Sequence, residues 1–221
     1  MRPLTVLHLD ERVLVCAKPP GMLTVPPPRG DRKGGDTILA DRLRQDGHGP
    51  VFPAHRIDKE TSGVVVCARD KETRDRLMGT FKRREVEKTY LAIVQGHPKP
   101  AEGTLRFPIK DLGALATVSN DGQAAETRYR TRRRLGPCAL VEVDLLTGRH
   151  NQIRLHFAHI GHALVGERKY ARGAAAIARH KRAALHASRI EFVHPWSGEL
   201  IVAEAPFPKD LENLVAKLAP G

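Results

Sequence analysis

The stretch His55-Arg56-Ile57-Asp58-Lys59-Glu60-Thr61-Ser62-Gly63, followed by Val64-Val65-Val66-Cys67-Ala68, is the most informative part of this chain. The apolar run has the length of a buried strand, and the polar residues before it form a turn that ends in glycine. In this turn the carboxylate of Asp58 could act as a nucleophile or a base. Taken alone, an Arg-x-Asp turn is more often a structural ion pair or an Asx-turn.

Length and composition limit the class of protein. The chain has 221 residues, of which 41% are hydrophobic, enough for one generous domain or two small ones. We expect a single domain over residues 1–221. The sequence has no secretory signal and no apolar run long enough to span a bilayer. A soluble, cytoplasmic protein without a membrane partner is therefore expected.

Charge and cysteine usage narrow the partners. Lys and Arg number 37 against 25 Asp and Glu, which gives a formal net charge of +12 and favours an anionic partner, with nucleic acid the leading candidate. The three cysteines, Cys16, Cys67 and Cys138, are far apart and form no Cys-x-x-Cys motif. Their spacing argues against a zinc site and a disulfide framework, and the apolar runs around Cys16 and Cys67 predict buried, reduced thiols.

Periodicity predicts a mixture of strands and helices. Strands are expected at 13–17, 64–68, 90–94, 127–132, 140–145, 189–193 and 200–203, and helices after the N-caps Thr37 and Asp70, over 151–160 and at the C-terminus. The Gly136-Pro137 turn predicts that the fourth and fifth of these strands form an antiparallel hairpin. We therefore expect an α+β fold with a mixed, mainly antiparallel sheet flanked by helices.

Five motifs in consecutive order resemble the RluA family of RNA pseudouridine synthases over nearly the whole chain. The second is similar to the signature His-Arg-Leu-Asp-x-x-Thr-Ser-Gly, and the fourth to Gly-Arg-x-His-Gln-Ile-Arg. The chain departs from the family at Asn151, where His is usual, and at Glu167, where Asp is usual. The motifs are Val15-Cys16-Ala17-Lys18-Pro19-Pro20-Gly21, His55 to Gly63, Glu87-Lys88-Thr89-Tyr90-Leu91-Ala92, Gly148-Arg149-His150-Asn151-Gln152-Ile153-Arg154, and Leu185-His186-Ala187 with Phe192, His194 and Pro195.

The resemblance implies the pseudouridine synthase catalytic fold, in a short form that lacks the small N-terminal RNA-binding domain of many relatives. It also implies an enzyme that isomerises specific uridines of structured tRNA or 23S-type rRNA to pseudouridine. The N1–C1′ bond breaks, the uracil rotates and it rejoins through C5, so neither a metal nor an organic cofactor is needed. The expected partners are RNA stem-loops, bound by a monomer.

The same resemblance assigns roles to residues. Asp58 is implied to be the essential carboxylate, and whether it attacks the sugar, attacks the base or removes a ribose proton stays open. Arg154 is implied to be its ion-pair partner, and Tyr90 the ring that lies against the uracil and handles the C5 proton. Arg56 could fill the gap left when the target nucleotide swings out of its stack. His55, Thr61 and Leu185 complete the expected substrate-binding set.

Other interpretations of these residues stay open. A catalytically silent RNA-binding or ribosome-assembly protein could keep the same fold. A glycoside or nucleoside hydrolase normally pairs two acids, and Glu60 is the only candidate near Asp58. His156, His159 and His162 turn steadily off one helix face, which argues against a metal site. The basic run 82–84 suits either a helix C-terminus or RNA.

Overall fold

The computed structural model describes residues 3–27, 36–113, 115–171 and 178–219. The chain divides into two compact units. Unit 1 consists of Met1–Glu87 and Ala187–Pro206, and unit 2 of Lys88–His186 and Phe207–Gly221. Strands β5 (Val86–Gln95) and β11 (Leu185–Val193) contribute residues to both units. Each unit is described below by itself.

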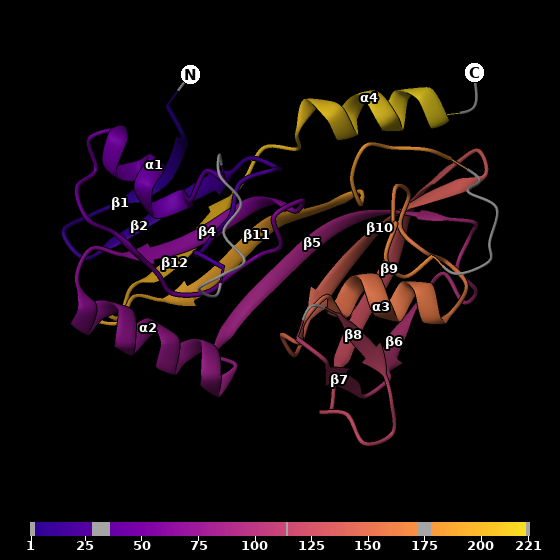
Figure 1. The fold of residues 1–221 in the computed structure, drawn as a ribbon, viewed down its shortest axis with the longest axis horizontal. Helices are drawn as coiled ribbons and strands as arrows, with labels where there is room; N and C mark the ends of the chain where they lie inside the picture. The colour runs from indigo at the N-terminus through magenta and orange to yellow at the C-terminus, as the bar shows by residue number, and fades with distance from the viewer. Residues whose placement is uncertain (1–2, 28–35, 114, 172–177, 220–221) are drawn as a thin grey trace. The chain divides into compact units, whose positions relative to one another are not determined.

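Unit 1 is built on an antiparallel sheet. Its strands follow the order β1, β2, β4, β11, with β3 paired to β4 and β12 paired to β11. Helix α2 packs against β3 and β4 and runs across the direction of the strands (Figure 1). The bounds are β1 Thr5–Leu9, β2 Val13–Lys18, α1 Leu39–Gln45, β3 Phe52–Pro53, β4 Ser62–Ala68, α2 Lys71–Arg83 and β12 Leu200–Glu204.

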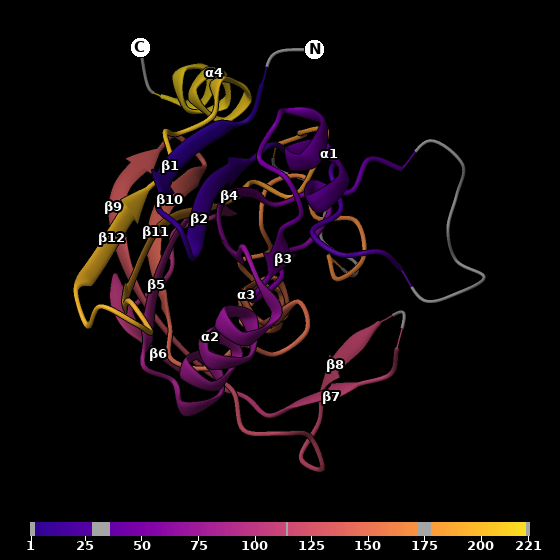
Figure 2. The same cartoon turned by 90° about the vertical axis from the view of Figure 1, so that its left-hand side faces the viewer.

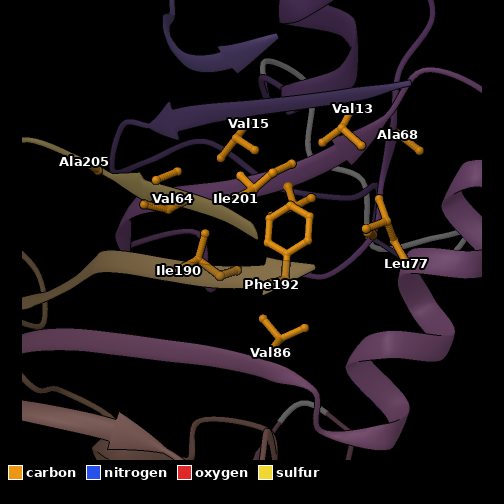
Figure 3. Close-up of a cluster of buried hydrophobic side chains, with 13 residues drawn as sticks. Val13, Val15, Val64, Ala68, Leu77, Val86, Ile190, Phe192, Ile201 and Ala205 are labelled. Carbon is orange, nitrogen blue, oxygen red and sulfur yellow. The ribbon is translucent and has the colours of Figure 1, made fainter. Parts of the chain in front are cut away.

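The core of unit 1 gathers around Phe192, which is 1% exposed. Figure 3 shows its ring among aliphatic side chains of the neighbouring strands, with Leu77 of α2 reaching toward them. Every residue of β4 is buried. A strand covered on both faces needs apolar side chains at consecutive positions, which explains the unbroken run Val64 to Ala68 and confirms the predicted strand.

The two helices of unit 1 begin differently. Asp70 caps α2, because its side chain accepts a 2.8 Å hydrogen bond from the N–H of Thr73, as predicted. The predicted cap at Thr37 is wrong. Helix α1 begins after Ile38, which is extended and provides no side-chain cap. Ile38 is 4% exposed and forms a β-bridge with Leu23. The N-cap position is therefore occupied by a buried apolar residue, which has no side-chain acceptor for the first N–H groups of the helix.

Unit 2 contains the antiparallel strands β5, β10, β9 and β6, in that order. The predicted hairpin around Gly136 is confirmed as β9–β10. Strands β7 and β8 form a separate ribbon that stands off from this sheet (Figure 2). The bounds are β6 Glu102–Arg106, β7 Ile109–Asp111, β8 Ala116–Val118, β9 Glu126–Leu135, β10 Cys138–Leu145, α3 Gln152–His159 and α4 Lys209–Leu218.

Helices α3 and α4 cover different parts of unit 2. Leu211 and Leu214 of α4 pack on Ile93 and Cys138, which confirms the predicted apolar stripe of the C-terminal helix. Leu155 of α3 belongs to a smaller cluster with residues of the β7–β8 ribbon. The α+β class with a mainly antiparallel sheet is therefore confirmed.

Two further expectations concern the cysteines and the membrane. All three cysteines are buried and free, which confirms the buried, reduced thiols predicted at Cys16 and Cys67. Within the described ranges, no helix combines the length and the apolar character that crossing a membrane requires.

Candidate active site

Four of the predicted site residues lie together in one loop of unit 1. This loop joins β3 to β4 and carries His55, Arg56, Asp58 and Thr61. Asp58 is half-buried and Arg56 is exposed, whereas Thr61 is only 3% exposed. The N–H of Thr61 donates to the carbonyl oxygen of Asp58 over 3.1 Å. The backbone therefore turns tightly just after the carboxylate.

Thr24 fixes the residue that precedes Asp58. Its hydroxyl donates to the carbonyl oxygen of Ile57 over 2.9 Å and accepts from the N–H of the same residue over 3.2 Å. Both Thr24 and Ile57 are buried. One hydroxyl thus satisfies both backbone polar groups of Ile57, which would otherwise be costly to bury. This clamp holds the backbone from which the Asp58 side chain projects.

Lys18 holds the loop that carries Asp58 through hydrogen bonds to backbone carbonyls. This lysine ends β2 and is 1% exposed. Its ammonium donates to the carbonyl oxygens of Pro19, Met22 and Lys59 over 3.0, 2.8 and 3.2 Å. The N–H of Gly21 also donates to the Lys59 carbonyl over 2.8 Å. The first family-like motif therefore cradles the loop of the second.

His55 attaches the same loop to β4 and α2. Its Nε2 accepts a 3.0 Å hydrogen bond from the backbone N–H of Val66, and its ring stacks on Phe81 with 4.6 Å between ring centroids. A backbone N–H can only donate, so this hydrogen bond requires a lone pair on Nε2. The imidazole is therefore held as the tautomer whose proton is on Nδ1.

Gly63, the second residue of β4, lies where β4 and β11 come very close. Its φ is +122°, and a Cβ placed on it would lie 2.1 Å from the carbonyl oxygen of Ala187 on β11. Only glycine accommodates both the backbone angle and this approach. The glycine of the signature therefore allows close strand packing directly after the loop that carries Asp58.

The remaining predicted residues belong to unit 2 and lie on three different elements. Tyr90 is on β5, opposite Val143 of β10, and is 8% exposed. Leu185 begins β11 and is 5% exposed, and its carbonyl oxygen accepts from Nη1 of Arg182 over 2.9 Å. Arg154 is on α3 and is 8% exposed.

Arg154 is held by Glu167. Its Nε and Nη2 donate to the two carboxylate oxygens of Glu167 over 2.6 and 2.8 Å, which is a bidentate pair. Burial alone would raise the pKa of Glu167, but hydrogen bonds from Arg154 and from the N–H groups of Lys169 and Tyr170 outweigh it and hold the pKa below its ordinary value. Glu167 is therefore an anion whose position fixes the guanidinium.

Both departures from the family pattern contact Arg154. Besides Glu167, Asn151 accepts from Nη1 of Arg154 over 3.0 Å through its Oδ1. Its Nδ2 donates to the hydroxyl of Tyr170 over 2.7 Å, and the Tyr170 ring centroid lies 5.3 Å from Cζ of Arg154. The amide thus joins the arginine to the aromatic ring that lies against it.

The three histidines near α3 contact Phe107 and Gln95. Nε2 of His156 pairs with the carbonyl oxygen of Phe107 over 2.9 Å, and Nδ1 of His162 with that of Gln95 over 2.8 Å. The ring of His159 packs on Phe107, 4.4 Å between centroids. Within the described ranges no three His, Cys, Asp or Glu side chains are grouped as metal ligands. These histidines have structural contacts.

Comparison with known proteins agrees with the motifs. The family model for RNA pseudouridylate synthase matches residues 12–159. The chain is 40% identical to ribosomal large subunit pseudouridine synthase D of Xanthomonas campestris pv. campestris, covering 98% of this chain and 70% of that protein. It is 34% identical to dual-specificity RNA pseudouridine synthase RluA of Escherichia coli O6:H1, covering 92% and 93%.

The fold agrees as well. The solved structure of human RNA pseudouridylate synthase domain containing 4 superposes with a TM-score of 0.81 at 24% identity, covering 97% of this chain and 92% of that one. The family model and the sequence relatives together decide the assignment. The chain belongs to the RNA pseudouridylate synthase family, whose members isomerise uridine in RNA to pseudouridine.

Proposed function

We propose that this enzyme isomerises specific uridines of structured rRNA or tRNA and that Asp58 is its essential carboxylate. The observation that carries the proposal is the support of the Asp58 loop. Hydrogen bonds that involve Thr24, Lys18 and His55 hold its backbone, while Asp58 is only half-buried. A reactive group is effective when its position is fixed before the substrate arrives.

The reaction balances without any added group. The N1–C1′ bond breaks, a C5–C1′ bond forms, and the proton on C5 moves to N1 in the product. Asp58 serves as nucleophile toward the sugar or the base, or removes a ribose proton. Tyr90 is proposed as the group that transfers the C5 proton. Arg154 is proposed as the cation that pairs with the Asp58 carboxylate. The motif matches support both assignments.

Access to the uridine requires that it leave its stack. Flipping a nucleotide costs a few kcal/mol, and least where the base is already unpaired, so loops and bulges of RNA are the proposed targets. Arg56 is exposed on the same loop as Asp58, where a planar guanidinium can replace the missing base. His55, Thr61 and Leu185 are proposed to shape the pocket around the flipped nucleotide.

The class of RNA, the cell compartment and the oligomeric state are also proposals. A relative with 40% identity is named for the ribosomal large subunit, which favours an rRNA stem-loop over tRNA. Three buried free thiols suit a reducing compartment, which favours the cytoplasm. We propose that one copy of the chain acts on its RNA as a monomer.

The test is to map pseudouridines in rRNA and tRNA of cells with and without this protein, then to treat unmodified transcripts of the changed sites with purified enzyme. Asp58→Asn is expected to lower product formation at least about a thousandfold while RNA affinity stays within about twofold. Asp75→Asn is the matched control, because Asp75 is 65% exposed on α2.

The outcomes separate the candidate functions. Product from the parent and the control, with none from Asp58→Asn, supports the proposal. Equal product from Asp58→Asn contradicts the role of Asp58. RNA binding without product from the parent would favour the catalytically silent alternative.

A further inference from the structure

Arg84 has a backbone conformation that favours glycine. It follows α2 with φ +64° and ψ +32°. Its N–H donates to the Phe81 carbonyl oxygen and the next N–H, of Glu85, donates to that of Thr80, both over 3.1 Å. This pair of hydrogen bonds is the Schellman motif, whose left-handed residue is usually glycine because a Cβ is strained there. An arginine at this position therefore lowers the stability of the fold.

A second residue shows that the conformation is unusual for arginine. Of the residues the structure describes, only Arg84 and Asn151 combine a side chain larger than hydrogen with positive φ. Asparagine tolerates the left-handed region because its short side chain hydrogen-bonds locally, as Asn151 does. Arginine has no such compensation. Because the backbone conformation disfavours arginine, the reason for an arginine at this position has to lie in its guanidinium.

The side chain of Arg84 is available to a ligand. Arg84 and Lys82 are exposed, and neither has a carboxylate partner in the described part of the chain. Arg83 differs, because its Nε and Nη2 each donate to Glu85 over 2.8 Å. The helix dipole explains a cation in the last turn, which Lys82 and Arg83 already provide. It does not explain a strained arginine one residue later.

The end of α2 also lies against the reactive loop. Phe81, in the last turn, stacks on His55 at 4.6 Å between centroids. His55 is followed by the exposed Arg56 and, two residues further, by Asp58. Arg84 is three residues beyond Phe81 in the same unit. The stacking of Phe81 on His55 therefore links the last turn of α2, and the arginine that follows it, to the loop that carries Asp58.

We propose that Arg84, assisted by Lys82, binds backbone phosphates of the RNA beside the target uridine. The guanidinium fork matches two phosphate oxygens, and such contacts position a nucleic acid without reading its sequence. This inference rests on the proposed function and deepens it, since it names a surface that grips the substrate. In this proposal the phosphate contact accounts for the backbone strain at the end of α2.

The decisive variant is Arg84→Gly, which removes the guanidinium and relieves the backbone. We expect its melting temperature to equal or exceed that of the parent while RNA binding weakens about three- to tenfold at low salt. In a plot of the logarithm of the binding constant against the logarithm of the salt concentration, the slope should become shallower by about 0.7 to 0.9. This is the contribution of one phosphate contact. Arg83→Gln removes the same formal charge from the paired neighbour and should change the affinity less than twofold.

The probe is a fluorescent RNA stem-loop in which cytidine replaces every loop uridine. It cannot be isomerised, so this experiment reports phosphate binding whether or not Asp58 is the catalytic group. An Arg84→Gly protein with parental affinity and salt slope overturns the inference. So does an equal loss from Arg83→Gln, or a loss of affinity that merely follows a lower melting temperature.

Discussion

Arg154 and Glu167 form a buried bidentate ion pair in which the carboxylate side chain is 0% exposed. Both departures from the family pattern contact the same guanidinium. Glu167 holds two nitrogens of the guanidinium and Asn151 holds the third. Hydrogen bonds thus orient all three side-chain nitrogens of Arg154.

Removing the Glu167 carboxylate should be costly. Glu167→Ala is expected to lower the free energy of unfolding by about 3–5 kcal/mol, because it leaves a buried guanidinium without its anion. Chemical denaturation measures the change. Glu85→Ala is the control, since it breaks an exposed bidentate pair with Arg83 and should cost less than about 1 kcal/mol. Similar losses in both variants would contradict a special role for burial.

The same carboxylate predicts a pH dependence. The pKa of Glu167 is below its ordinary value of 4.5, so the folded protein releases this proton more readily than the unfolded chain does. The ion pair therefore adds stability above about pH 4.5, and this stability is lost as pH falls through the lower pKa of the folded state. Denaturation of the parent and of Glu167→Gln from pH 7 to pH 3 should show a steeper acid loss in the parent. Parallel curves would refute the prediction.

Gly63 should not tolerate a side chain. Gly63→Ala places a Cβ at 2.1 Å from a backbone oxygen on β11, where no flexible side chain can move aside. We expect a loss of at least about 3 kcal/mol or an insoluble protein. Gly198→Ala also has positive φ but meets nothing within 4 Å, so its cost should be about 1 kcal/mol. Thermal melting compares the two, and equal melting temperatures would show that the strands separate easily.

Thr24 tests whether the support of the loop matters for catalysis. Thr24→Val keeps the shape but removes both hydrogen bonds to Ile57. Unsatisfied buried groups cost about 1–3 kcal/mol each, and the loop should shift to recover them. The expected result is a kcat about 10- to 100-fold lower with RNA affinity within about twofold. Thr24→Ser should restore kcat, and a variant whose rate matches the parent would exclude a positioning role.

Local patterns predict the elements whose evidence is local. The run Val64 to Ala68 identifies β4 because a doubly covered strand is apolar throughout, and alternation on both sides of Gly136 identifies the β9–β10 hairpin. The β7–β8 ribbon has no such pattern, because Ile109–Asp111 and Ala116–Val118 are too short to show a period. Thr37 has a side chain suited to capping, but the helix begins one residue later because Ile38 is buried at the N-cap.

The site divides in the same way. The motif at residues 55–63 predicts the loop that carries Asp58, but the residues that hold this loop are far away in sequence. Thr24 is 33 residues from Ile57, and Lys18 is 41 from Lys59. One signal for Lys18 was present, since a lysine that continues an apolar strand into Pro-Pro-Gly has to find buried acceptors. No pattern around Glu167 predicts its pairing with Arg154.

The enclosure of Lys18 gives the enzyme a built-in reporter. An amine 1% exposed reacts with an acylating reagent only in the moments when residues 19–22 and Lys59 separate from it. Its labelling rate in a mass spectrum therefore counts these openings, with the exposed Lys82 as the reference in the same sample. Because the same amine donates to the Lys59 carbonyl, each opening also releases the loop that carries Asp58.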